Sequence, residues 1–221
     1  MKQPKENIDL LFGFPCRCLD EGSKKSIIKV VKSIRNHHPL APIVLVDSNS
    51  TDKSYFDEVK KFGNVFIEDV NNSGYEAGAV WHIYENYIAD VYVFLQDTLE
   101  LRRSLTEFSS QRLGVFVSHE GSGWLYADQR DMQFARTELL KTEYHHDYDD
   151  FRIVQYNAFL AGREIMDKFK DKHLDKVIPW DKFGSSAMER IWGIALAQEG
   201  YEIEKYLLPD YTVYKTLGGK K

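Results

Sequence analysis

The chain has 221 residues, of which 43% are hydrophobic and 29% are charged, and its formal net charge is −5. This length favours one domain with an elaborated second half over two domains, so we expect a single domain over 1–221. The composition excludes an intrinsically disordered chain. Because the net charge is negative, the chain has no excess of basic residues to bind nucleic acid, and no nucleic-acid partner is expected.

The cysteines and the apolar runs indicate the cellular compartment in which the protein is expected. Cys16 and Cys18 are separated by one residue, which is too close for an ordinary disulfide and unlike a paired zinc-ligand pattern. Reduced thiols are the simpler interpretation and favour a cytoplasmic protein. No apolar stretch approaches the roughly 20 residues of a membrane span, and Met1–Asn7 lacks a signal-peptide core. We therefore expect a soluble protein without a transmembrane segment.

Short strand-like and helix-like stretches alternate through the first half of the chain. Apolar runs predict strands at 8–14, 42–46, 65–67, 91–95 and 113–117. Apolar residues at three- and four-residue spacing predict helices at 26–34, 56–62 and 77–88, with Ser50 as a candidate cap for the second. The alternation predicts an α/β fold with a mostly parallel central sheet flanked by helices. The second half is less regular, with a strand expected at 154–160 and helices at 163–169 and 186–199.

Polar residues and turns gather where the predicted strands end. Pro15, Asp47, Glu68 and Asp97 all lie at such ends. In open α/β sheets, ligands bind in the crevice at the carboxyl ends of the strands. Residues far apart in the sequence are therefore expected to meet at one edge of the sheet.

Three short motifs lie along this edge. In the first, Asp47–Asp52, a carboxylate just past a buried strand can accept hydrogen bonds from a base or ribose; the alternative is an ordinary strand-to-helix turn. In the second, Asn71–Gly78, the absence of side chains at Gly74 and Gly78 lets a phosphate or sugar approach a helix start. The alternative there is a capping box formed by Ser73 and Glu76.

The third motif is Phe94–Thr98, where an apolar strand ends in Gln96 and Asp97. A carboxylate leaving a central strand is well placed to meet a metal that bridges two phosphates, because Mg²⁺ and Mn²⁺ favour one or two carboxylates plus phosphate oxygens. The alternative is an aspartate that merely ends the strand in a turn.

Taken in this order, the three motifs resemble the nucleotide-sugar-binding half of the GT-A glycosyltransferases, over roughly residues 8–100. In inverting members of that superfamily the first motif usually has the pattern D-D/N-x-S-x-D and the third is the D-x-D metal motif. The chain is also similar, less specifically, to the short glycosyltransferases of large algal viruses and bacteriophages. The resemblance implies a Rossmann-like GT-A domain, with residues 1–100 as the nucleotide-sugar-binding half and 101–221 as the acceptor-binding half.

The resemblance also implies roles for individual residues. Asp47 is expected to contact the base or ribose, Asp52 to support that loop, and Asp97 to bind Mn²⁺ or Mg²⁺. Gln96 stands where the family has a first aspartate, which leaves a single carboxylate in the metal motif. The full set of expected nucleotide-sugar-binding residues is Phe14, Pro15, Asp47, Asp52, Gly74, Gln96 and Lys215.

A catalytic base must come from the second half, because an inverting transferase needs a carboxylate to take the acceptor hydroxyl proton. Glu189 is the leading candidate, since GT-A enzymes often place an acidic base at the start of a late helix; Asp181 and Asp128 are the reserves. The alternative is a capping box formed by Ser186 and Glu189.

Three other features are less specific. Trp124 is a candidate for stacking on a sugar, although a buried aromatic is the commoner explanation. The run His145–Asp150 has the composition of a metal cluster, but a solvated loop is favoured. The tail 214–221 is either a basic lid over a diphosphate or a frayed terminus, with Lys215 the best candidate to bind.

The function predicted from these observations is an inverting, metal-assisted transfer of a sugar from a nucleotide-diphosphate sugar to an acceptor hydroxyl. The expected partners are the donor and a glycan, glycoprotein or glycolipid acceptor. Two alternatives stay open: a nucleotide-sugar-binding module that has lost catalysis, and a nucleotidyltransferase, although residues 14–18 lack the glycine-rich loop usual there. A dinucleotide-dependent dehydrogenase is disfavoured because no G-x-G-x-x-G follows the first strand.

Overall fold

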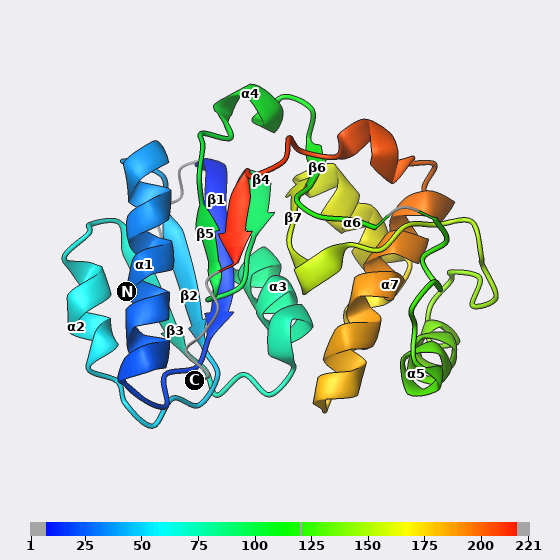
Figure 1. The fold of residues 1–221 in the computed structure, drawn as a ribbon, viewed down its shortest axis with the longest axis horizontal. Helices are drawn as coiled ribbons and strands as arrows, with labels where there is room; N and C mark the ends of the chain where they lie inside the picture. Colours follow the sequence, from blue (N-terminus) through cyan, green and yellow to red (C-terminus); the bar gives the residue numbers. More distant parts are fainter. Residues whose placement is uncertain (1–7, 120, 216–221) are drawn as a thin grey trace.

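The computed structural model describes residues 8–119 and 121–215, and its centre is a six-stranded sheet with the order β3-β2-β1-β4-β7-β6 (Figure 1). The strands β1, β2, β3 and β4 are parallel, whereas β7 runs antiparallel to both β4 and β6. The six strands are β1 (Ile8–Cys16), β2 (Ile43–Asp47), β3 (Val65–Asp69), β4 (Ala89–Phe94), β6 (Leu113–Val115) and β7 (Phe159–Gly162). The prediction of a mostly parallel α/β sheet is confirmed.

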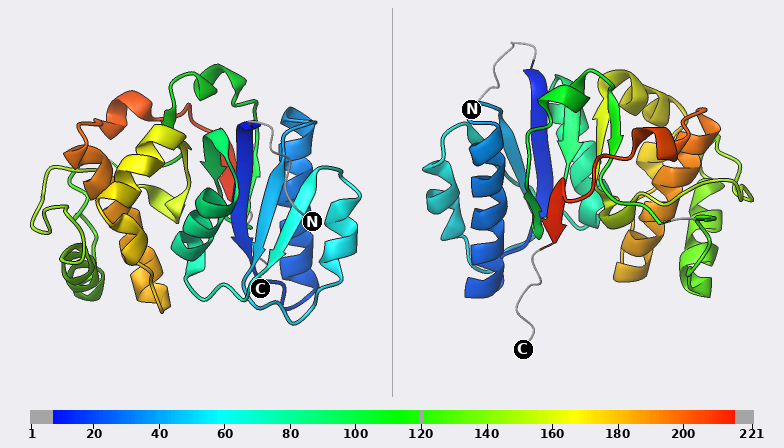
Figure 2. Two further views of the ribbon diagram at one scale, coloured as in Figure 1. Left: turned by 180° about the vertical axis from the view of Figure 1, so that it is seen from behind. Right: turned by 45° about the horizontal axis from the view of Figure 1, so that its top comes forward.

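Helices cover both faces of the sheet (Figures 1 and 2). One face packs against α1 and α2 and against a small antiparallel ribbon, β5 (Leu99–Leu101) with β8 (Val213–Lys215). The other face packs against α3, α6 and α7. The α-helices are α1 (Glu21–His37), α2 (Tyr55–Lys60), α3 (Tyr75–Asn86), α4 (Thr106–Ser109), α5 (Gln129–Leu139), α6 (Arg163–Asp171) and α7 (Lys182–Gln198). Within the described ranges, no helix has the length and apolar character needed to cross a bilayer.

The strands are buried on both faces because side chains alternate along each of them. In β1, Phe12 and Phe14 belong to the core under α1 and α2, whereas Leu11 belongs to the core under α3 and α7. In β2, Leu45 points toward α1 and α2, and Val46 points the other way. This alternation decides which strand-end side chains can reach a ligand.

The helix starts differ from the expected caps. Ser50 does not cap α2; its Oγ instead accepts a hydrogen bond from the Cys18 backbone N–H, at 2.7 Å. The first helical residue of α3 is Tyr75, and its cap position Gly74 has no side chain, so the proposed Ser73–Glu76 capping box does not form. The side chain of Glu76 is thereby free for another role.

The second half holds most of the elements that were not predicted: β5, β8, α4 and α5. The helix α7 begins four residues earlier than expected, because Asp181 caps it by accepting from the Gly184 N–H at 2.7 Å. The strand expected at 154–160 is instead β7, which begins at Phe159 and ends at Gly162, because Gln155–Asn157 forms a 3₁₀ turn in which Tyr156 and Asn157 have positive φ angles of 63° and 51°. Two further 3₁₀ turns lie at Leu174–Lys176 and Ile203–Tyr206.

Candidate functional site

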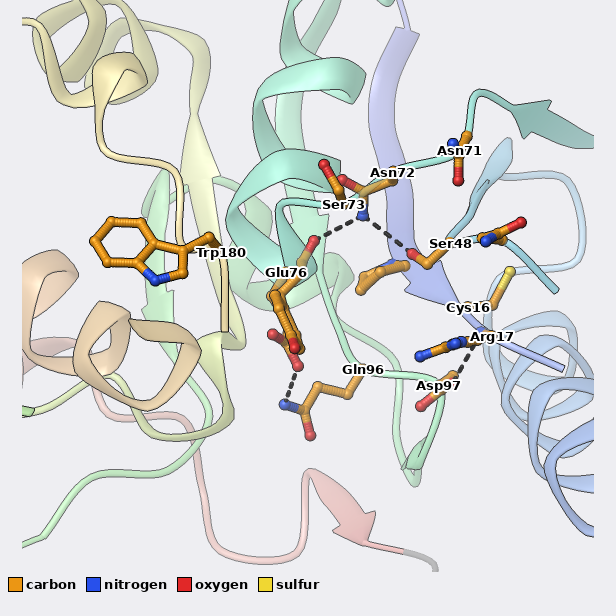
Figure 3. Close-up of a pocket in the computed structure, with 13 residues that line it drawn as sticks. Cys16, Arg17, Ser48, Asn71, Asn72, Ser73, Glu76, Gln96, Asp97 and Trp180 are labelled. Atoms are coloured by element: carbon orange, nitrogen blue, oxygen red, sulfur yellow. Dashed lines mark hydrogen bonds between the residues drawn. The ribbon is translucent and has the colours of Figure 1, made fainter. Parts of the chain in front are cut away.

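A pocket of about 310 Å³ lies at the carboxyl ends of β1, β2 and β4 (Figure 3). The end of β1 contributes Pro15, Cys16 and Arg17, and the loop after β2 contributes Ser48 and Asn49. The segment before and at the start of α3 supplies Asn71–Ser73, Tyr75 and Glu76, the end of β4 supplies Gln96 and Asp97, and Trp180 stands at the far side. The predicted convergence of strand ends is thus present for Pro15 and Asp97, with Gln96 beside them, whereas Asp47 and Glu68 do not line the pocket.

Asn72 holds the wall of the pocket formed by the second motif. Its Nδ2 donates to Ser48 Oγ at 3.0 Å and to the Tyr75 carbonyl at 2.8 Å, and its Oδ1 accepts from the Gly74 N–H at 3.1 Å. A Cβ built on Gly78 would lie 2.3 Å from this Oδ1, so Gly78 is required for the side chain of Asn72 to fit. One amide side chain therefore fixes the loop after β2 to the start of α3.

Asp97 is half-buried at the end of β4. One oxygen of its carboxylate lies 3.5 Å from the Arg17 N–H, and its main-chain carbonyl accepts from Ser26 Oγ at 2.7 Å. Burial, with a smaller contribution from the charge of Glu76, raises the pKa of Asp97 to about 6, against the opposing effects of the Arg17 N–H and Lys182. Within the described ranges, the one hydrogen bond from another residue to this carboxylate is the long bond from Arg17, so the group is suited to meeting a ligand or a cation.

Glu76 connects the pocket to α7. Its Oε1 accepts from Gln96 Nε2 at 2.8 Å, and its Oε2 accepts from Ser185 Oγ at 2.7 Å (Figure 3 shows the first bond). Both oxygens of the carboxylate are therefore engaged, one from each half of the chain. The contact places the first turns of α7 beside the end of β4.

Glu189 lies one turn beyond Ser185 on α7. Its Oε1 accepts from the Tyr156 backbone N–H at 2.8 Å. Burial, with a smaller contribution from the charge of Glu76, raises the pKa of Glu189 to about 7, against the opposing effects of the Tyr156 N–H, Arg190 and Lys215. A general base works best when its pKa is near the operating pH.

Lys215 reaches the same region from β8, where it pairs with Leu99, two residues after Asp97. Its Nζ lies 3.9 Å from the centre of the Tyr156 ring. Burial lowers the pKa of Lys215, although the charges of Glu189 and Asp97 favour its protonated form. The rest of the predicted basic tail lies outside the described residues.

Five of the seven predicted donor-site residues do not line the pocket: Phe14, Asp47, Asp52, Gly74 and Lys215. Asp47 is fully buried and does not line the pocket: its carboxylate accepts from the Tyr55 hydroxyl at 2.8 Å and from the Ser50 N–H at 3.1 Å. Phe14 is also buried, in the core under α1. The physical reason is strand alternation, which turns both side chains toward α1 and α2.

Gly74 and Asp52 have structural positions as well. A Cβ on Gly74 would lie 2.6 Å from Cγ2 of Ile178, so this glycine permits close packing rather than the approach of a ligand. Asp52 accepts from the Ser54 N–H at 2.8 Å, which supports its loop as expected, but it does not line the pocket.

The reserve candidates for the catalytic base and the less specific sequence features also have defined positions in the structure. Asp181 caps α7, and Asp128 caps α5 by accepting from the Arg130 N–H at 2.6 Å. The indole of Trp124 donates to the Tyr148 carbonyl at 3.1 Å and packs edge-on against Phe151, away from the pocket. His145–Asp150 forms no metal cluster, since the described residues contain no group of three or more potential ligands.

Sequence reasoning missed Trp180, which lines the pocket with 66% of its surface exposed and lies 5.0 Å from the ring of Phe134. Its position directly before the helix cap Asp181 was the available signal. Arg17 and Glu76 were missed as well; Glu76 had been assigned to a capping box.

The donor groups of the pocket can be tested against a divalent cation. Of the two carboxylates among the described lining residues, Glu76 is engaged through both oxygens and Asp97 retains a free oxygen. Mg²⁺ in phosphate-binding sites often takes one or two carboxylates and draws its other ligands from water and phosphate. Asp97 fits that mode of binding.

The sequence matches no protein-family model and no curated protein, but the fold is similar to solved structures. TarS residues 1–349 from S. aureus align with a TM-score of 0.50 and 10% identity, over 84% of this chain and 56% of that one. The chain has a GT-A fold. The same TarS fragment in complex with UDP gives a TM-score of 0.48 at 10% identity, over 80% and 53% of the two chains.

A third similar structure is the galactosyltransferase LgtC in complex with donor and acceptor sugar analogs. Its TM-score is 0.47 at 13% identity, over 82% of this chain and 70% of that chain. The chain spans just over half the length of the TarS fragment. At these identities the similarity concerns the fold, so the activity has to be argued from the site.

Proposed function

We propose that this GT-A domain is a glycosyltransferase that moves a sugar from a nucleotide-diphosphate sugar to an acceptor hydroxyl, with inversion at the anomeric carbon. The observation that carries the proposal is the pair Asp97 and Glu189. These are two carboxyl groups with raised pKa values, from opposite halves of the chain. Glu76 lies between the segments that carry them, because it accepts hydrogen bonds from Gln96, next to Asp97, and from Ser185, one turn before Glu189. Titratable groups perturbed by burial and by specific neighbours are typical of reactive sites.

The donor is proposed to lie along the pocket from the loop after β2 to Asp97. Ser48, Asn49 and Asn71 offer hydroxyl and amide groups that suit a base and ribose. Lys215 brings positive charge near Asp97, where a diphosphate would need it, and Arg17 lines the same pocket. Mn²⁺ or Mg²⁺ bound at Asp97 would supply electrostatic stabilisation of the leaving diphosphate.

Glu189 is proposed to act as the base. The acceptor oxygen attacks the anomeric carbon, the bond between that carbon and the diphosphate oxygen breaks, and the acceptor proton passes to the Glu189 carboxylate. The electron pair of the broken bond leaves with the diphosphate, where Arg17 and Lys215 stabilise it. Since Glu189 must be ionised to accept the proton, transfer should increase as the pH rises through about 7.

The acceptor is proposed to bind on the side of Trp180. Its exposed ring stands at the end of the pocket away from the nucleotide loops, and the α7 segment that follows it leads to Glu189. Aromatic side chains present a large apolar face with low conformational freedom, which suits the apolar faces of a sugar ring. This geometry favours a glycan, glycoprotein or glycolipid acceptor.

A second candidate is a nucleotide-sugar-binding module without catalysis. Gln96 supports it, because this side chain is committed to Glu76 and the metal motif retains one free carboxylate. The two candidates share the donor site and differ in turnover alone, so a release assay for the nucleoside diphosphate separates them.

The test is a thermal-shift screen of UDP-, GDP- and dTDP-sugars with and without Mn²⁺, because a ligand that binds the folded state raises its apparent stability. We expect one nucleotide class to raise the Tm, Asp97→Ala to remove the Mn²⁺-dependent part, and Asp52→Ala, which lies outside the pocket, to retain the shift. If no nucleotide-sugar shifts the wild-type protein, the proposed function is wrong.

A further inference from the structure

The turn between Val154 and Asn157 is attached to α7 at three points. The Val154 N–H donates to the Glu189 carbonyl at 2.8 Å, and the Tyr156 N–H donates to the Glu189 carboxylate at 2.8 Å. The Asn157 side chain donates to the Ser185 carbonyl at 3.0 Å. The turn therefore holds both the main chain and the side chain of Glu189.

The backbone of this turn is strained. Tyr156 and Asn157 both have left-handed φ angles, 63° and 51°, although neither is glycine. Asn157 is buried, and its Oδ1 has no hydrogen-bond partner among the described residues. Such conformations each cost on the order of 1–3 kcal/mol and persist where the surrounding structure imposes them, often at functional sites. The left-handed conformation of Tyr156 aims its N–H at Glu189.

The side chain of the same residue contacts the C-terminal strand. Lys215 Nζ lies 3.9 Å from the centre of the Tyr156 ring, within the range of a cation–π interaction. The pairing of Lys215 with Leu99 sets this lysine near Asp97 at the diphosphate end of the pocket. Tyr156 is thus the one described residue that contacts Glu189 through its backbone and Lys215 through its ring.

We infer that Tyr156 is a positioning residue that couples the diphosphate-binding lysine, Lys215, to the catalytic base, Glu189. The inference rests on the proposed function for the roles of these two partners. With its ammonium on the Tyr156 ring, Lys215 stays close enough to favour the ionised form of Glu189; when Lys215 is released, Glu189 loses that stabilisation. Movement of Lys215 toward a diphosphate would therefore make the ionised form of Glu189 less stable.

Three other groups influence the protonation of Glu189. Arg190 and the Tyr156 N–H favour its carboxylate, and Glu76 opposes it. None of these groups depends on the Tyr156 ring: Arg190 lies on α7 beside Asp131, and Glu76 is fixed by Gln96 and Ser185. Loss of the ring should therefore act on Glu189 through Lys215.

The test is a ¹³C NMR titration of the glutamate carboxyl carbons in the full chain, with Glu189 assigned by comparison with Glu189→Gln. Tyr156→Gly removes the ring, and glycine accepts the left-handed φ without strain. We expect the titration midpoint of Glu189 to rise by about half a pH unit or more in Tyr156→Gly and in Lys215→Gln. Tyr156→Phe, which keeps the ring, should restore the wild-type midpoint.

The double variant Tyr156→Gly/Lys215→Gln should show no larger rise than either single variant, because both changes remove one interaction. Equal midpoints in wild type and Lys215→Gln would overturn the inference, even if Tyr156→Gly proved unstable. A rise in Tyr156→Phe as large as that in Tyr156→Gly would overturn it too.

A second arm measures the binding of UDP, GDP and dTDP to the same variants. Tyr156→Gly should weaken the nucleotide that binds, by about fivefold, and Tyr156→Phe should bind it like the wild type. If no nucleotide binds the wild type, the proposed function fails, and the titration still decides the coupling. If a nucleotide binds equally well to the wild type and to Tyr156→Gly, the proposed function stands and the inference is wrong.

Discussion

The two halves of the chain build the site by different means. In the first half, Pro15, Ser48 and Asp97 meet because the parallel strands that precede them end at one edge of the sheet. In the second half, Glu189 and Lys215 arrive through contacts that join segments far apart in the sequence, such as the bond between Ser185 and Glu76 and the pairing of β8 with β5. The first half therefore supplies most of a preformed pocket, whereas the second half adds Trp180 to its lining and carries the proposed base on α7, outside that lining.

The largest expected effect comes from the second half. Glu189→Gln should lower transfer by about 10²- to 10⁴-fold, because it removes the proposed base. The folded state raises the pKa of Glu189 to about 7, so deprotonation costs stability as the pH rises from the unfolded value toward and through 7. The variant should therefore be more stable than wild type at pH 8, on the order of 2 kcal/mol after allowance for solvent screening.

Chemical denaturation of both proteins at pH 5 and pH 8, together with a transfer assay, measures this prediction. If Glu189→Gln destabilised the protein at both pH values, the bond from the Tyr156 N–H would outweigh the cost of burying the charge, and the stability part of the prediction would be contradicted.

The next prediction distinguishes the roles of two aspartates in the first half, Asp47 and Asp97. Asp47→Ala should destabilise the protein by about 2–4 kcal/mol, because it leaves the Tyr55 hydroxyl and the Ser50 N–H unpaired in a buried setting. Asp97→Ala should change stability by less than about 1 kcal/mol while weakening nucleotide binding, since its carboxylate has one long hydrogen bond.

Urea unfolding and nucleotide titration of both variants distinguish the roles. A folded Asp47→Ala protein should bind nucleotide with nearly the wild-type affinity. If Asp47→Ala alone strongly weakened nucleotide binding, Asp47 would belong to the donor site after all.

The smallest effect concerns the two tryptophans of the second half. Trp180→Ala should leave the Tm almost unchanged, because the side chain is 66% exposed, and should raise the KM for the acceptor by about tenfold. Trp124→Ala is the matched control: it removes a packed and hydrogen-bonded indole and should cost about 2–3 kcal/mol of stability. The hypothesis of an acceptor side at Trp180 is contradicted if steady-state kinetics show the same acceptor KM for Trp180→Ala and wild type.

The fold of the first half could be predicted because apolar runs and helical periodicity are local properties. The strand-end principle then located the pocket, and with it Pro15, Gln96 and Asp97. It did not distinguish the two faces of a strand, and that is why Asp47 and Phe14 were placed in the site although alternation turns them into the core. Side chains two residues apart point to the same face of a strand, so alternation counted from Leu45 would have placed Asp47 in the core under α1 and α2.

The second half was less predictable because its site depends on non-local contacts. The expected capping pairs at Ser73–Glu76 and Ser186–Glu189 had plausible spacing, but the helices begin at other residues. Freed from capping, Glu76 links the two halves. No periodicity in the sequence encodes that Glu76 meets Ser185 or that Lys215 meets Tyr156.

The most direct test of the central claim is an NMR map of nucleoside diphosphate binding, with UDP, GDP and dTDP added to ¹⁵N-labelled protein. We predict that one of them perturbs the amides of Arg17, Ser48, Asn72 and Asp97, with smaller changes at Lys215. Perturbations confined to another surface, such as the cavity at residues 8–10 and 37–42 at the opposite ends of the strands, would contradict the claim. So would the absence of any perturbation.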